Sequence, residues 1–66
     1  MTDHEKIAKL LNKKFSAMDF TKIERLEDGI WNLVDKTGEM FVHFEGNVAK
    51  IRSIVNSIEY EKSIEL

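Results

Sequence analysis

The spacing of hydrophobic residues changes once along the chain, near Asp19. Before Asp19 the apolar side chains follow the 3.6-residue period of an α-helix and form a single stripe. These side chains are Ile7, Leu10, Leu11, Phe15 and Met18. Thr2 and Glu5 fit a capping box, in which each side chain satisfies the backbone amide of the other residue. The pattern therefore predicts a helix over about residues 2–16.

After Asp19 turn signals recur every 8 to 10 residues, a spacing typical of short strands in an antiparallel meander or small barrel. The signals are Asp28-Gly29, Lys36-Thr37-Gly38, Gly46-Asn47 and Asn56-Ser57. The strands expected between them cover residues 21–27, 30–35, 39–45, 48–55 and 58–65. The predicted fold class is α+β, an N-terminal helix followed by an antiparallel meander of four to five strands. We expect one small domain over residues 1–66.

The C-terminal region also permits a helical interpretation, in which Asn47 caps a second helix. Its apolar residues fit helical spacing as well, namely Val48, Ile51, Ile54, Val55 and Ile58. The alternative fold is then α-β-β-β-α with a C-terminal helix from about residue 47. The many β-branched residues of the segment, and Asn56-Ser57 in its middle, favour strands.

The turns suggest how the strands pair. A two-residue turn at Gly46-Asn47 places Phe44 opposite Ala49, and a turn at Asn56-Ser57 places Arg52 opposite Glu61. If Asp35 lies opposite Glu39, then Trp31 lies opposite His43, and Leu33 lies opposite Phe41. This register gathers aromatic and basic side chains on one face of the sheet, and we take them as candidate binding residues. They are Trp31, Leu33, Phe41, His43, Lys50 and Arg52.

One hairpin resembles a known repeat. The stretch from Asp28 to Glu39, with Ile30-Trp31-Asn32-Leu33-Val34 in its first strand, resembles a hairpin of the WG-type β-repeats. Those repeats typically place Gly after the Trp, where this chain has Asn32. The resemblance covers about a dozen residues, occurs once, and supports a turn at Lys36-Thr37-Gly38.

Composition narrows the classes of function. The chain has no Cys, so a disulfide and a thiolate zinc site are both excluded, and we expect no cofactor or metal. None of its serines lies in a Gly-x-Ser-x-Gly elbow, and neither His4 nor His43 has a recognisable triad partner, so we do not expect an enzyme. No apolar run approaches the ~20 residues that cross a bilayer, and we expect a cytoplasmic protein without a membrane partner.

The expected function is a small protein-interaction module, acting as an adaptor, an inhibitor or a subunit. It would bind a protein partner or a second copy of itself through an uncovered sheet face or an edge strand. The alternative is a binder of single-stranded nucleic acid, because aromatic side chains interleaved with basic ones can stack bases and neutralise phosphates. The net charge of −2 disfavours that alternative. The candidate residues belong to the core if the helix covers their face of the sheet, and to the surface if it covers the other face.

Overall fold

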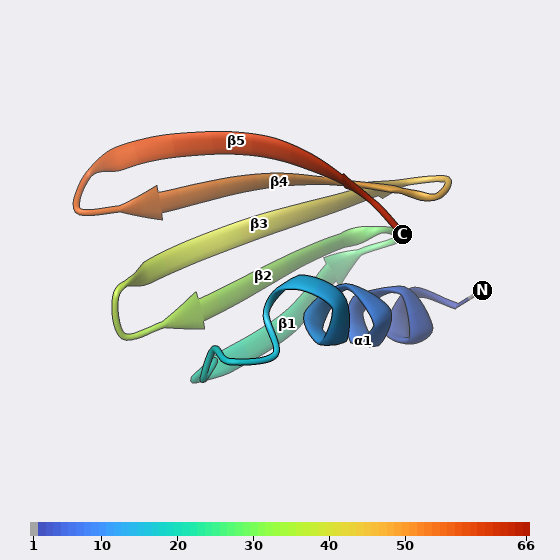
Figure 1. The fold of residues 1–66 in the computed structure, drawn as a ribbon, viewed down its shortest axis with the longest axis horizontal. Helices are drawn as coiled ribbons and strands as arrows, with labels where there is room; N and C mark the ends of the chain where they lie inside the picture. The colour runs from blue at the N-terminus through green and yellow to red at the C-terminus, as the bar shows by residue number, and fades with distance from the viewer. Residues whose placement is uncertain (1) are drawn as a thin grey trace.

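The structure is a computed structural model that describes residues 2–66. One helix is followed by five strands: α1 (Asp3–Lys14), β1 (Lys22–Glu27), β2 (Ile30–Asp35), β3 (Gly38–Glu45), β4 (Val48–Val55) and β5 (Ile58–Glu65). The strands form one antiparallel sheet in chain order, and α1 lies across one side of it (Figure 1). The predicted α+β meander is confirmed. The C-terminal helix is wrong, because the β-branched segment pairs as β4 and β5.

The N-terminus of α1 is fixed by its own side chains. The Thr2 hydroxyl accepts a hydrogen bond from the Glu5 amide at 3.2 Å, and the Thr2 amide donates to the Glu5 carboxylate at 3.2 Å. This capping box satisfies two amides that would otherwise lack partners, so the helix begins at Asp3. At the other end the Phe15 amide donates to the Leu11 carbonyl at 2.9 Å. No helix within residues 2–66 is both long and apolar enough to cross a membrane.

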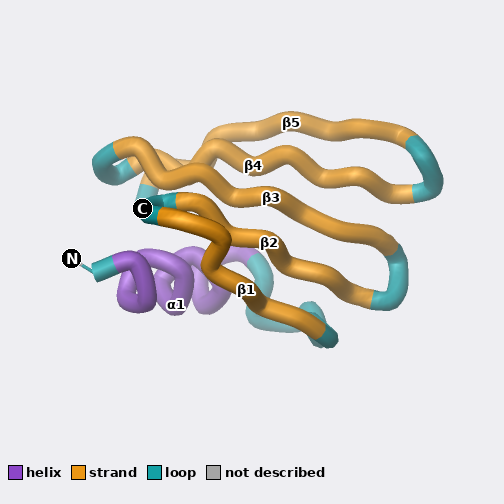
Figure 2. The backbone as a smooth tube through the Cα atoms, turned by 180° about the vertical axis from the view of Figure 1, so that it is seen from behind, coloured by secondary structure: helices purple, strands orange, loops and turns teal. Residues whose placement is uncertain are grey.

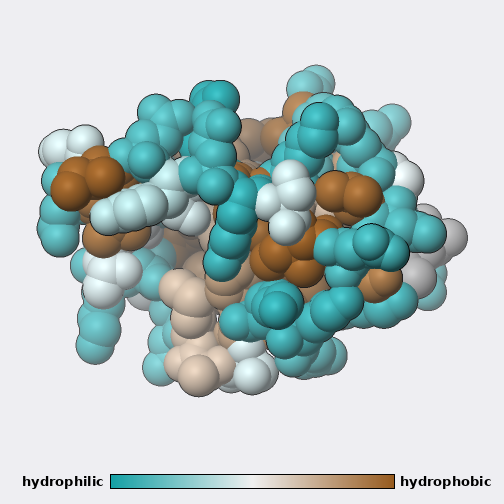
Figure 3. All heavy atoms as spheres, turned by 45° about the horizontal axis from the view of Figure 1, so that its top comes forward, coloured by the Kyte–Doolittle hydropathy of each residue, from teal (hydrophilic) through white to brown (hydrophobic). Residues whose placement is uncertain are grey.

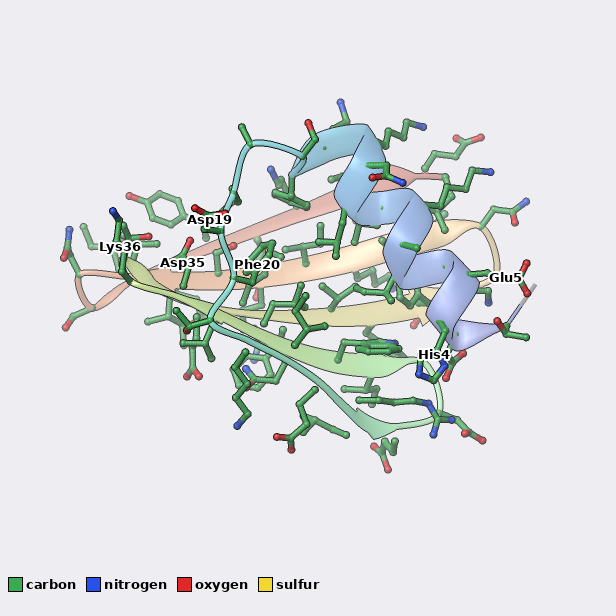
Figure 4. The ribbon with its side chains drawn as sticks, turned by 90° about the horizontal axis from the view of Figure 1, so that it is seen from below. His4, Glu5, Asp19, Phe20, Asp35 and Lys36 are labelled. Atoms are coloured by element: carbon green, nitrogen blue, oxygen red, sulfur yellow. The ribbon has the colours of Figure 1, made fainter. Side chains whose placement is uncertain are left out.

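The hydrophobic core lies between α1 and the sheet. Figure 4 looks onto α1 from below, with the strands behind it. From the helix, Ile7 and Leu10 are buried against the sheet. The sheet contributes Trp31, Leu33, Met40, Val42, Phe44, Ala49, Ile51 and Ile64. We call this side of the sheet the covered face. Burial of one large aliphatic side chain contributes roughly 1.5–3 kcal/mol, so this single layer supplies most of the driving force for folding.

A network of hydrogen bonds joins the start of α1 to the turn between β1 and β2. The Asp3 carboxylate accepts from the Gly29 amide at 2.8 Å and from Arg25 Nε at 2.9 Å. Arg25 also forms an ion pair with Asp28. The Gly29 amide and Arg25 hold the pKa of Asp3 below its usual value, because both favour the ionised carboxylate. The helix is thus anchored to the sheet at this end by polar contacts as well as by packing.

Two of the predicted strand registers are correct. Phe44 lies opposite Ala49 across the β3–β4 turn, and Arg52 lies opposite Glu61 in the β4–β5 pair. The predicted register of β2 and β3 is wrong by one residue. Asp35 pairs with Gly38 rather than with Glu39, because Gly38 belongs to β3 and not to the turn.

Contacts of Asp35 and Gly38 explain this difference. The Asp35 carboxylate accepts hydrogen bonds from the Thr37 amide at 2.8 Å and the Gly38 amide at 3.0 Å, which closes a tight turn at Lys36-Thr37. The backbone of β4 also approaches Gly38 closely, since a Cβ there would lie 2.2 Å from the Ile54 carbonyl oxygen. Glycine is therefore placed here by a close strand contact, not by the geometry of the turn.

The one-residue shift moves two candidate residues to the opposite face, because side chains alternate along a strand. Trp31 pairs with Val42 and Leu33 with Met40, so both lie on the covered face. They are 4% and 0% exposed, respectively. The prediction that Trp31 and Leu33 share a surface with Phe41, His43, Lys50 and Arg52 is therefore wrong, and α1 covers the face that holds them.

Candidate functional site

The side of the sheet opposite α1 is the candidate functional surface. In Figure 2 α1, the one helix that the described residues form, lies below β2 to β5, and β1 crosses in front of its end. We call the side opposite α1 the open face. It retains four of the six predicted candidates, Phe41, His43, Lys50 and Arg52. They come from two adjacent strands, with Phe41 opposite Arg52 and His43 opposite Lys50.

A shallow groove of about 610 Å³ crosses the open face. Its lining includes all four of these residues, together with Ile30 of β2 and Glu61 and Ser63 of β5. Ile30 lies opposite His43, and both Ile30 and Phe41 are partly exposed. The groove thus has a small apolar floor, and charged side chains surround it. Large grooves of this mixed character are where proteins commonly bind ligands or partners.

The basic residues of the groove are engaged by glutamates on neighbouring positions. Lys50 Nζ lies 2.9 Å from the Glu45 carboxylate, and His43 Nδ1 lies 3.8 Å from it. Lys50 lowers the pKa of Glu45, mainly through their hydrogen bond and also through its charge. Arg52 bridges Glu59 at 2.9 Å and Glu61 at 3.3 Å. These exposed pairs add little stability, but they fix the positions of the charged groups around the groove.

The open face as a whole is acidic. Strand register places three fixed cations on it, Lys22, Lys50 and Arg52. It also carries seven glutamates, which are Glu24, Glu27, Glu39, Glu45, Glu59, Glu61 and Glu65. Seven carboxylates against three fixed cations give this face a net charge of −4 with histidine neutral. Within residues 2–66 neither the Glu39 nor the Glu65 carboxylate forms an ion pair.

Asn32 is a residue of the open face that the sequence did not single out. Only 6% of it is exposed, although it lies on the uncovered side of the sheet. Its amide nitrogen is 3.5 Å from the Glu39 carboxylate and 3.5 Å from the Met40 carbonyl oxygen. It pairs with Phe41 across β2 and β3. The sequence did contain a signal for this residue. Asn32 is a polar residue between the apolar Ile30 and Val34, and these three positions share one face of a strand.

A second, smaller apolar surface lies at the end of the covered face that α1 does not reach. Figure 3, which looks from the side of the sheet opposite α1, shows hydrophobic atoms at the left end of the molecule, where β4 turns into β5 in Figure 1. Three large side chains contribute, and we call them the end patch: Met18, Ile58 and Tyr60, which are 41%, 55% and 56% exposed. A cavity of about 80 Å³ beneath Met18 is lined by Phe15, Phe20 and Val55. Figure 4 shows Phe20 pointing from the connecting loop toward the sheet.

Within residues 2–66 no three His, Asp or Glu side chains are grouped so that they could hold a metal ion. The pKa of Asp35 is lowered, first by the Thr37 hydroxyl and then by the Thr37 and Gly38 amides, and these contacts belong to a turn. The open face itself combines an apolar floor, paired cations and surplus carboxylates.

Comparison with known proteins identified no relative of this chain. No protein-family model, no curated protein and no solved structure matches this chain.

Proposed function

We propose that this chain is a small protein-interaction module that binds a protein partner through the open face. The observation that carries the proposal is the groove of about 610 Å³ on a sheet face that no helix of residues 2–66 covers. A sheet normally buries each apolar face against another layer of structure. Ile30, Phe41 and Ile54 lie on this face, so a partner layer would complete their burial.

Affinity would come from Phe41 and Ile30 in the centre of the groove. Aromatic anchors surrounded by polar groups that exclude water dominate many protein interfaces, and truncating one costs 2 kcal/mol or more on typical scales, about a 30-fold loss of affinity. The ion pairs around Lys50 and Arg52 would select the partner and its orientation. An adaptor, an inhibitor and a subunit all fit this mode of binding.

The main argument for binding of single-stranded nucleic acid no longer holds. The predicted stacking surface contained Trp31, which is buried under α1. Phe41 and His43 are the remaining rings on the open face, and carboxylates outnumber fixed cations there. A surface with net negative charge repels phosphates, so we propose a protein partner instead.

The test compares two truncations of exposed apolar residues. Phe41→Ser removes the centre of the groove, and Ile58→Ser is the matched control in the end patch. Each tagged variant is incubated with extract of the source cells, and bound proteins are quantified by mass spectrometry. Circular dichroism and the emission of Trp31 verify that both variants fold.

We expect specific proteins to be retained by the wild type and by Ile58→Ser, and to fall at least tenfold with Phe41→Ser. Retention of the same proteins by all three chains would overturn the proposal. Loss with Ile58→Ser alone would assign binding to the end patch and would overturn it equally.

A further inference from the structure

We infer that the occupant of the open face is a basic amphipathic α-helix supplied by another protein. This inference rests on the proposed function and adds the chemistry of the partner. It follows from the width of the groove, from the charge of the open face, and from the lack of a matching surface on a second copy of the chain.

The width of the groove suits a single helix. Its lining residues run from Ile30 on β2 to Ser63 on β5, which spans four adjacent strands. Three inter-strand spacings correspond to about 14 Å, and a helix with its side chains is about 10–12 Å across. An extended peptide would pair with the backbone of an edge strand, not with the middle of a sheet face. A helix therefore fits this surface better than a strand does.

The charge of the open face selects a basic partner. Its three fixed cations each already have a carboxylate within 3.0 Å, as in Lys22–Glu24, Lys50–Glu45 and Arg52–Glu59. Glu39 and Glu65 form no ion pair within residues 2–66. An acidic partner would have to displace existing pairs, whereas a basic one would meet carboxylates that have no cation.

The positions of Glu39 and Glu65 also indicate the length of the partner helix. Glu39 shares a row across the sheet with Ile54 and Glu59, and Glu65 lies six residues further along β5 than Glu59. Six residues of a strand correspond to about 20 Å. A helix rises 1.5 Å per residue, so about 14 residues would cover this distance along the strand direction. A partner helix of roughly four turns would carry lysine or arginine toward both ends and an apolar side chain between them, over Phe41.

A second copy of this chain lacks that combination. The solvent side of α1 is basic, with Lys9 and Lys14 exposed, whereas Lys13 donates a hydrogen bond to the Glu65 carbonyl oxygen of β5. However, its apolar residues Ile7 and Leu10 are buried under the helix and offer no anchor for the groove. Two open faces placed against each other would bring like net charges together. The occupant is therefore a separate protein.

The experiment uses designed peptides of about 14 residues as probes. In the basic probe leucines repeat at helical spacing and lysines fill the other positions. The acidic probe has glutamates in place of the lysines, and a scrambled probe keeps the basic composition without the spacing. Binding to the whole chain is measured by calorimetry, and backbone amide shifts locate the bound probe.

We expect the basic probe to bind at least tenfold more tightly than either of the others, with its largest shifts at Phe41, Lys50 and Arg52. Replacing Glu39→Gln and Glu65→Gln together should weaken it about tenfold. The control pair Asp19→Asn and Asp28→Asn changes net charge equally but lies in loops outside the open face, and it should weaken binding less than twofold.

Three results would overturn the inference: equal binding of the acidic or scrambled probe, equal weakening by the control pair, and shifts confined to the end patch. A dimer in solution that Phe41→Ser dissociates would also overturn it, since the occupant would then be a second copy. If Phe41→Ser abolishes capture of a cellular protein while the basic probe does not bind, the interface stands and the partner chemistry is wrong. If Phe41→Ser changes no capture, the proposed function itself fails.

Discussion

At the scale of single residues, two residues in the turn between β4 and β5 adopt an unusual backbone conformation. Asn56 and Ser57 have positive φ angles of 53° and 67°. Two-residue hairpins favour this conformation at both positions, but glycine, not serine, adopts it without steric cost. The sequence therefore contains a strained residue at a position where a short hairpin requires it.

Ser57→Gly should stabilise the chain. Relief of the left-handed conformation contributes about 1 kcal/mol, partly offset by the greater freedom of glycine in the unfolded chain. We expect the midpoint of urea denaturation to rise. The matched control is Ser63→Gly in the exposed edge strand β5, where glycine should lower stability by roughly 0.5–1 kcal/mol. A fall in stability for Ser57→Gly would contradict the account of this turn.

Acid should weaken the contact between Asp3 and the β1–β2 turn. The Gly29 amide and Arg25 lower the pKa of Asp3 from an ordinary value of 3.8, so the folded chain binds its proton less readily than the unfolded chain does. The stabilisation is complete above pH 3.8 and disappears as pH falls through the lower, folded-state pKa. Asp3→Asn should therefore be less stable than the wild type at pH 7, with the difference shrinking in acid.

Urea denaturation at a series of pH values measures this difference. The control is Asp19→Asn, since Asp19 is exposed and lies in the loop after α1. The control should differ little from the wild type at pH 7. A constant gap between Asp3→Asn and the wild type down to pH 2 would show that the carboxylate charge is not the cause.

At the scale of elements, the close approach of β3 to β4 depends on Gly38. A methyl group there would lie 2.2 Å from the Ile54 carbonyl oxygen, closer than atoms can approach. Gly38→Ala should push β3 and β4 apart at this end and cost about 1–3 kcal/mol, as overpacking does. Gly46→Ala is the control, because Gly46 has a φ of 59° but no neighbouring atom within 4 Å of the added methyl group. If Gly38→Ala costs less than Gly46→Ala, the close contact is not what fixes the strand.

The same glycine shows how far sequence could predict these elements. Helix and strand bounds followed from apolar spacing and turn residues, and three of the five predicted strands have the observed bounds, residues 30–35, 48–55 and 58–65. The register of β2 and β3 did not follow. A glycine beside Lys36-Thr37 is equally consistent with a longer turn and with a strand contact, and the contact with Ile54 becomes visible only in three dimensions. One residue of shift then moved Trp31 and Leu33 from surface to core.

At the scale of the whole molecule, the helix is too short to cover its sheet. A helix of 12 residues spans about 18 Å, whereas strands of 8 residues span about 27 Å. This mismatch exposes the end patch, while the absence of a second helix from residues 2–66 leaves the open face uncovered. Sequence predicted apolar residues on both faces, but coverage of a face depends on strand register, and register depends on long-range contacts.

These two exposed surfaces predict a monomer. The open face has a net charge of −4, so two copies repel one another there. The end patch offers three partly exposed large side chains, whereas a stable interface needs roughly 20–30 residues and 800 Å² on each side. Sedimentation equilibrium at tens of micromolar protein should therefore return the mass of one chain, 7.7 kDa. A doubled mass that Ile58→Ser restores to one chain would show that the end patch is a larger interface than its exposed side chains indicate. A doubled mass that Phe41→Ser restores would instead show that apolar contact on the open face outweighs its charge.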